Sequence, residues 1–102
     1  MSDNELIVRI PHSLGAVEAR TRIADGIDAA QTQYGQFLRT AELVWDANRL
    51  NFRLSALAHT VRGSVDVQEE FVELRAQLPL VIRLLANRFL PVVRNTGQKL
   101  LK

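Results

Sequence analysis

The segment Leu50–Ala56, LNFRLSA, alternates strictly between apolar and polar side chains. Leu50, Phe52 and Leu54 fall on one side of an extended chain, and the polar residues between them fall on the other. Successive side chains of a strand point to opposite faces, so this pattern predicts a ribbon with one apolar face. Such a ribbon is stable only where other elements cover that face. The chain therefore needs a sheet with helices packed on one side.

Four further segments favour strands. ELIVRI (Glu5–Ile10) is β-branched and ends at Pro11, and AELVWD (Ala41–Asp46) places Leu43 and Trp45 on one face. HTVRGSVDVQ alternates valines around Gly63. EEFVELRAQL is rich in helix formers, so a helix stays open there, but its alternation favours a strand.

Two segments favour helices. Apolar residues recur at spacings of three and four from Leu14 to Ile27, which predicts a helix from Ser13, as its N-cap, to about Gln33. Gly35 is then expected to take a left-handed cap. Pro79 suits the first position of a second helix, which runs to about Leu90 before Pro91 kinks or ends it.

The predicted architecture is one α+β domain over residues 1–102, in the order β-α-β-β-β-β-α. An antiparallel sheet of four to five strands has one face covered by two helices, and residues 79–102 form a basic amphipathic C-terminal helix and tail. Strand order stays open, although the first strand beside the last is one solution. The residues after Leu90 are expected to be dispensable for the fold.

The totals exclude several classes of function. The chain has no cysteine and two histidines, so disulfides, thiol chemistry and a histidine-rich metal site are excluded. No apolar run reaches the ~18–20 residues of a membrane span, and no signal peptide is expected. No motif in the sequence indicates a catalysed reaction, so a non-enzymatic role without a cofactor is favoured. The expected location is the cytoplasm.

Charge is distributed unevenly along the chain. The net charge is +2, but residues 79–102 contain five basic side chains and no acidic one. The predicted helix in residues 79–102 has a wide apolar face bordered by basic residues. Such a helix can bind an anionic or hydrophobic surface, and it can equally be a core helix whose outer side is basic. The candidate binding residues are Arg83, Arg88, Arg94, Lys99 and Lys102.

The block Pro11-His12-Ser13-Leu14-Gly15 is the other candidate site. An imidazole can act as a general base, but neighbouring Ser13 cannot be its nucleophile, since adjacent side chains point apart. We interpret the block as a joint between strand and helix. The free N–H groups of the first helical turn could still bind an anion beside His12, Ser13 and Gly15.

The order of these features resembles a known family. The PHSLG block, Arg20, Trp45, Phe52, Gly63 and Leu78-Pro79 occur as in the polyhydroxyalkanoic acid system proteins, small bacterial proteins encoded beside the genes for polyester storage granules. The resemblance covers nearly the whole chain. It implies a role in granule synthesis or regulation, and it assigns no catalytic residues.

Three hypotheses follow. The first is an accessory protein that binds the granule surface, or a granule-associated protein, through the basic C-terminal region; a homodimer through that region stays open. The second is a small RNA- or ribosome-binding module, which the acidic residues elsewhere in the chain disfavour. The third is a binder of hydroxyacyl-type ligands in a pocket between sheet and helices.

Overall fold

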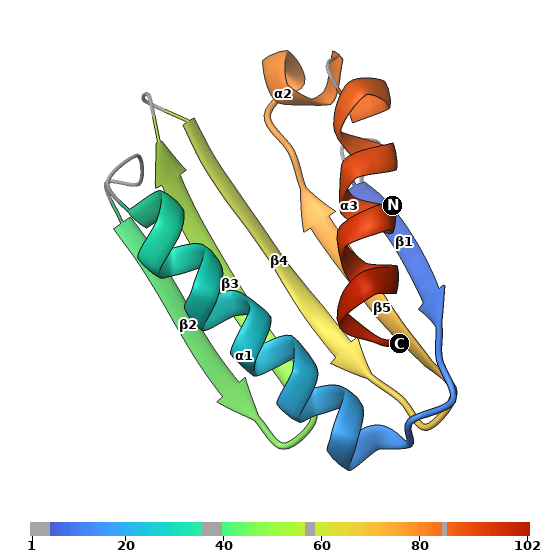
Figure 1. Ribbon diagram of the computed structural model, residues 1–102. Helices are drawn as coiled ribbons and strands as arrows, with labels where there is room; N and C mark the ends of the chain where they lie inside the picture. The colour runs from blue at the N-terminus through green and yellow to red at the C-terminus, as the bar shows by residue number, and fades with distance from the viewer. Residues whose placement is uncertain (1–4, 36–39, 57–58, 85) are drawn as a thin grey trace.

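The alternating segments form one antiparallel sheet in the computed structural model, which describes residues 5–35, 40–56, 59–84 and 86–102. The elements are β1 (Glu5–Pro11), α1 (Ala16–Tyr34), β2 (Thr40–Asp46), β3 (Arg49–Ala56), β4 (His59–Val67), β5 (Phe71–Gln77), α2 (Leu80–Leu84) and α3 (Ala86–Leu100). The sheet order is β1-β5-β4-β3-β2, so the first strand does lie beside the last (Figure 1). The α+β class and the five strands are confirmed.

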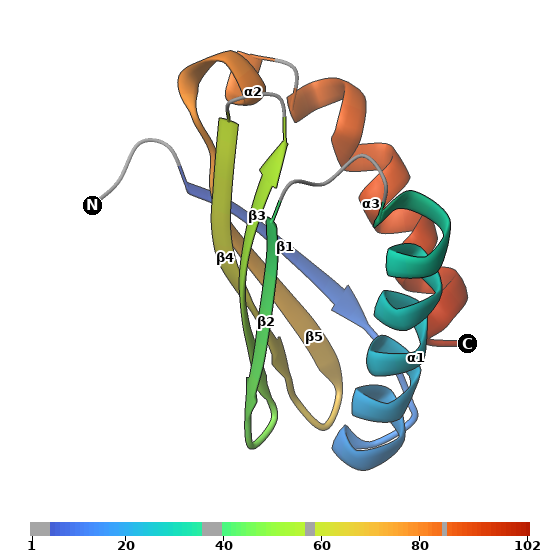
Figure 2. The same cartoon turned by 90° about the vertical axis from the view of Figure 1, so that its left-hand side faces the viewer.

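The register gives the sheet two chemically different faces. Leu50 lies opposite Trp45 on β2 and opposite Val65 on β4, and Phe52 lies opposite Leu43 and Gly63. This apolar face continues across β5 and β1, where Val8 lies opposite Leu74. Figure 2 shows α1 and α3 on this same side of the sheet, while the other side carries no helix. The period of two thus separates a covered face from an open one.

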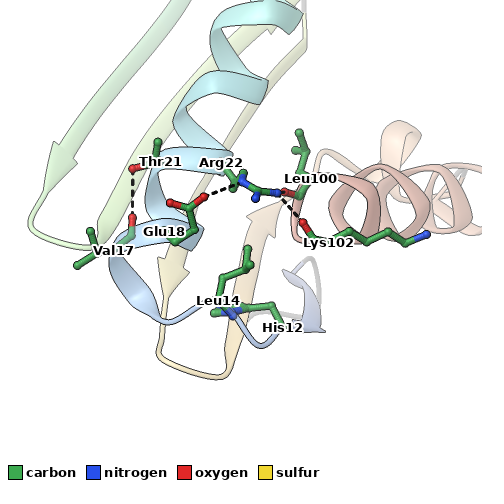
Figure 3. A network of polar contacts seen from close by, with 8 residues as sticks. All are labelled: His12, Leu14, Val17, Glu18, Thr21, Arg22, Leu100 and Lys102. Atoms are coloured by element: carbon green, nitrogen blue, oxygen red, sulfur yellow. Dashed lines mark hydrogen bonds and ion pairs between the residues drawn. The ribbon is translucent and has the colours of Figure 1, made fainter.

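Two close approaches fix the helices on the sheet. A Cβ atom added at Gly97 of α3 would collide with the terminal methyl group of Ile10 of β1, so the glycine lets this methyl group lie against the backbone of α3. A Cβ atom at Gly26 of α1 would lie 2.7 Å from both terminal methyl carbons of Leu100. The arginine side chain of Arg22 adds hydrogen bonds to the main-chain oxygens of Leu100 and Lys102, at 3.5 and 2.5 Å (Figure 3). The C-terminal end of α3 is therefore fastened to α1 and β1.

The buried core lies at this junction. Its members come from β1, α1, β4, β5 and the last turn of the chain: Val8, Ile10, Ala16, Ala19, Ile23, Val67, Val72 and Leu101. Leu101 lies in the C-terminal tail, which was expected to be dispensable for the fold. Leu101 is only 5% exposed and packs in the same core as Val8, so the end of the chain is part of the core and not a free tail.

Helix ends differ from prediction in three places. Ser13 does not cap α1, since Gly15 precedes the helix at φ 79° and no side chain bonds the free N–H groups there. Gly35 is right-handed, at φ −58°, and not left-handed. The single helix predicted from Pro79 to about Leu90 is divided into α2 and α3, and Pro91 lies inside α3 without ending it, although proline cannot donate a backbone hydrogen bond there.

None of the helices in the described ranges is both long enough and apolar enough to cross a membrane.

Candidate functional site

The PHSLG block is held by both nitrogens of His12. The backbone N–H of Leu14 donates to His12 Nδ1 at 3.1 Å, so the proton of a neutral ring lies on Nε2. Nε2 then donates to the carbonyl oxygen of Gln68 at 2.9 Å. The His12 N–H also donates to the Glu70 carbonyl at 2.9 Å. His12 therefore ties the β1–α1 joint to the β4–β5 turn, and neither ring nitrogen is left for proton transfer in this arrangement.

The start of α1 is faced by a carboxylate of the chain itself. Glu69 Oε2 lies 3.5 Å from the place where a Cβ of Gly15 would stand. A carboxylate near a helix N-terminus interacts favourably with the helix dipole, and it repels a second anion. The predicted anion site at His12, Ser13 and Gly15 thus meets a negative neighbour.

The C-terminal helices expose apolar side chains. On α2, Leu80, Val81 and Leu84 are 65%, 54% and 75% exposed, and on α3 Val92 is 61% exposed. The helix α2 has no buried residue at all. These side chains contribute little to the core, and their exposure leaves apolar surface available for contact.

Basic residues are also exposed on α2 and α3. Arg88, Val92 and Lys99 recur at spacings of four and seven, so they share the outward face of α3, and Val92 at the edge of this face also borders the hollow between α1 and α3. Arg94 lies exposed on the flank of α3, Lys102 is exposed beyond its end, and Arg83 is exposed on α2. No acidic residue in the described ranges pairs with Arg88, Arg94, Lys99 or Lys102. We define the C-terminal surface as Leu80, Val81, Leu84, Arg88, Val92 and Lys99.

The open face of the sheet is charged but balanced. Asp66 accepts a hydrogen bond from Arg49 Nε at 2.7 Å, and this bond together with charge attraction raises the pKa of Arg49. Glu73, only 8% exposed, lies 3.6 Å from Arg9 and 3.1 Å from Arg75. Glu73 is thus a buried carboxylate held between two arginines. The acids of this face pair with Arg9, Arg49 and Arg75, whereas Arg53 and Arg62 form no ion pair with a described residue.

The two large aromatic residues lie on the covered face. Trp45 lies opposite Leu50, with the Arg20 guanidinium 4.3 Å from the centre of its ring, and Phe52 lies over Gly63. A Cβ at Gly63 would be 2.6 Å from Phe52 Cζ and would collide with the Arg75 carbonyl. The expectation that Trp45 and Phe52 face the helices is confirmed. The open face therefore lacks these rings as a platform for stacking bases.

A hollow beneath α1 is the third feature, which we call the apolar passage. It has three compartments of 260, 510 and 350 Å³ that meet at Ile27. The first is lined by Ala30, Phe52 and Leu54, among other apolar side chains. The sequence allowed a pocket between sheet and helices, but it did not indicate which residues line it. The small side chain of Ala30 on the apolar stripe of α1 is the signal that could have done so.

Metal ligands do not gather in the described part of the chain. Within it, no three His, Asp or Glu side chains lie close enough to hold an ion. The features that remain for function are the C-terminal surface and the apolar passage.

A comparison with protein families gives a match over almost the whole chain. Residues 6–101 match the family described as "Putative polyhydroxyalkanoic acid system protein". The matched range runs from the second residue of β1 to the residue after α3. No curated protein matches the sequence.

Proposed function

Because the chain belongs to the polyhydroxyalkanoic acid system protein family, we propose that it is a non-enzymatic accessory protein of polyester storage granules in the bacterial cytoplasm. It binds the granule surface, or a protein on that surface, through the C-terminal surface. The family supplies the setting, and the exposed apolar and basic side chains of α2 and α3 supply the means.

The observation that carries this proposal is the combination of exposure and charge. Leu80, Val81 and Leu84 expose aliphatic surface on a helix with no buried residue. Arg88 and Lys99 flank Val92 on the outward face of α3, and residues 79–102 contain no acid. Moving aliphatic groups from water onto a hydrophobic surface lowers the free energy, and the basic groups are attracted to negative charge on that surface.

The RNA-binding alternative has less support. An RNA module needs several cations that remain available for phosphates. On the open face, Arg9, Arg49 and Arg75 are already paired with carboxylates, which leaves only Arg53 and Arg62 there without an ion pair among the described residues. A salt titration of RNA binding tests this alternative. No RNA binding at low salt would rule out the RNA alternative, and tight binding that weakens with added salt would favour it.

The test reverses charge on the outward face of α3. We expect Arg88→Glu/Lys99→Glu to lower co-sedimentation with isolated granules strongly, and Leu80→Ser/Leu84→Ser to lower it as well. Both pairs of residues are exposed, so the fold should survive these changes. Granules stripped of protein distinguish binding to the polyester surface from binding to a granule protein. The wild-type chain binds stripped granules only if it contacts the surface itself.

A matched control lies on the open face of the sheet. Arg53 and Arg62 are exposed, lie opposite one another, and form no ion pair with a described residue. Arg53→Glu/Arg62→Glu changes the net charge by the same amount as the α3 variant. Equal loss of granule binding in both double variants would overturn the proposal, since net charge alone would then explain it.

A further inference from the structure

The apolar passage lies where the cover of the sheet is thinnest. Phe52, Leu54 and Val65 belong to β3 and β4, near the middle of the sheet, yet all three remain partly exposed. Ala30 of α1 lines two of the compartments and is itself exposed. The C-terminal half of α1 therefore stands off the sheet, and no described side chain fills the space beneath it.

The walls of the passage select an uncharged, flexible ligand portion. The compartment lined by Ala30, Phe52 and Leu54 has Gln31 as its one polar lining residue among those described. The compartment between α1 and α3 adds Val93 and Leu100. Volumes of 260–510 Å³ lie near or within the range of roughly 300–1,000 Å³ typical of small-ligand sites.

One end of the passage is polar. The 510 Å³ compartment is lined by Arg20, Asp28 and Gln31, together with Trp45. Arg20 Nε donates to the Ala47 carbonyl at 3.1 Å, and its guanidinium stacks on Trp45 at 4.3 Å. These contacts fix the guanidinium, and no acid in the described ranges forms an ion pair with it. Asp28 lies two turns further along α1, about 12 Å away along the helix axis.

We infer that the apolar passage binds a single-chain acyl carboxylate. The aliphatic chain lies beneath α1 against Phe52 and Leu54, and the carboxylate pairs with Arg20 at the polar end. A fixed guanidinium forms short, strong hydrogen bonds to a carboxylate. The site shares Val92 with the C-terminal surface, but Phe52, Leu54 and Arg20 lie outside that surface, so acyl binding does not require granule binding by α2 and α3.

Binding is measured with decanoate below its micelle concentration. Trp45 is the single tryptophan of the chain and lines the polar compartment, so its fluorescence reports occupancy directly. We expect saturable binding, confirmed by calorimetry, with affinity rising about fourfold per added methylene from hexanoate to decanoate. Binding that does not saturate, or that is independent of chain length, would overturn the inference.

Two neighbouring alanines supply a matched pair of variants. Ala29 and Ala30 are both exposed on α1, but only Ala30 lines the passage. Ala30→Phe is expected to fill the passage and abolish decanoate binding, whereas Ala29→Phe leaves it unchanged. Equal effects of the two substitutions would contradict the inference, because the passage distinguishes these positions.

The head group is tested with Arg20→Gln. We expect this change to weaken decanoate about tenfold and to leave decanol unchanged, since only the carboxylate gains a charge-assisted hydrogen bond. An equal loss for acid and alcohol would overturn the assignment of Arg20. The alternative occupant of the passage is a second copy of the chain, which sedimentation analysis of the free protein tests. A dimer that dissociates in Ala30→Phe would mean that a second copy, and not an acyl chain, covers this face.

Discussion

The two halves of the apolar sheet face follow the same sequence pattern and end in different environments. On β1 and β5, Val8, Ile10 and Val72 are at most 5% exposed. On β2 and β3, Leu43, Trp45, Phe52 and Leu54 are only half-buried, although Leu50 between them is fully enclosed. Figure 1 shows α3 over β1 and β5, with α1 over the other strands. Alternation therefore determines which face is apolar, and the helices determine how far each half leaves water.

The difference comes from how closely each helix approaches. Gly97 lets α3 sit against Ile10, and Gly26 lets Leu100 pack onto α1, so backbone and side chains interlock around β1. No such approach brings the C-terminal half of α1 to β3, where Ala30 remains exposed. We infer that stability is concentrated in the β1–β5 half, and that the β2–β3 half keeps surface for binding.

The largest expected effect is that of removing α3. A chain terminated after Leu90 loses Gly97, Leu100 and Leu101, and it exposes Val8 and Ile10 to water. Since stabilities of small domains are only about 5–15 kcal/mol, we expect this chain to lose its cooperative urea transition. Circular dichroism during urea titration measures this. A truncated chain that still unfolds cooperatively near the original midpoint would show that the two halves do not differ in this way.

A pair of truncations within the sheet sharpens the comparison. Ile10→Ala is expected to lower the free energy of unfolding by about 2–4 kcal/mol, because it leaves a cavity in the tightly packed half. Leu54→Ala should cost only about 1 kcal/mol, since Leu54 is still partly in contact with water. Chemical denaturation with unchanged m-values gives both numbers. Similar losses at the two positions would contradict the proposed division of stability.

The sequence was sufficient to predict most of the strands and helices, but not how closely the helices pack on the sheet. All five strands and α1 follow from period-two and period-three-to-four patterns, which are local properties of the chain. The second predicted helix, from Pro79 to about Leu90, corresponds to α2 and only the first residues of α3. The fate of residues 91–102 was misjudged because Pro91 usually ends a helix, and the new start at Ala86 depends on how α3 packs. A glycine such as Gly97 signals a close approach only when its neighbour, Ile10, is known.

The candidate sites divide in the same way. The basic residues of 79–102 could be found from charge alone, and the structure places all five on exposed positions. Ser13 was assigned as a cap from its residue type, but the positive φ of Gly15 turns the chain before α1 begins. The apolar passage depends on the tilt of α1 against β3, which no local pattern encodes.

The smallest effect is expected at His12, which joins the well-covered strands to the start of α1. His12→Ala should cost about 0.5 kcal/mol, the low end for a hydrogen bond, because the Leu14 N–H and the Gln68 carbonyl lose the ring but can bond to water at this partly exposed site. His12→Asn is the matched variant: its short carboxamide can still accept from the N–H two residues on, but it cannot reach Gln68. We therefore expect slowed exchange of the Leu14 amide proton in wild type and His12→Asn, and faster exchange in His12→Ala. Unchanged exchange in His12→Ala would mean that the joint is held by the His12 backbone bond to Glu70, and that the ring contributes nothing to how firmly α1 is anchored to the β1–β5 half.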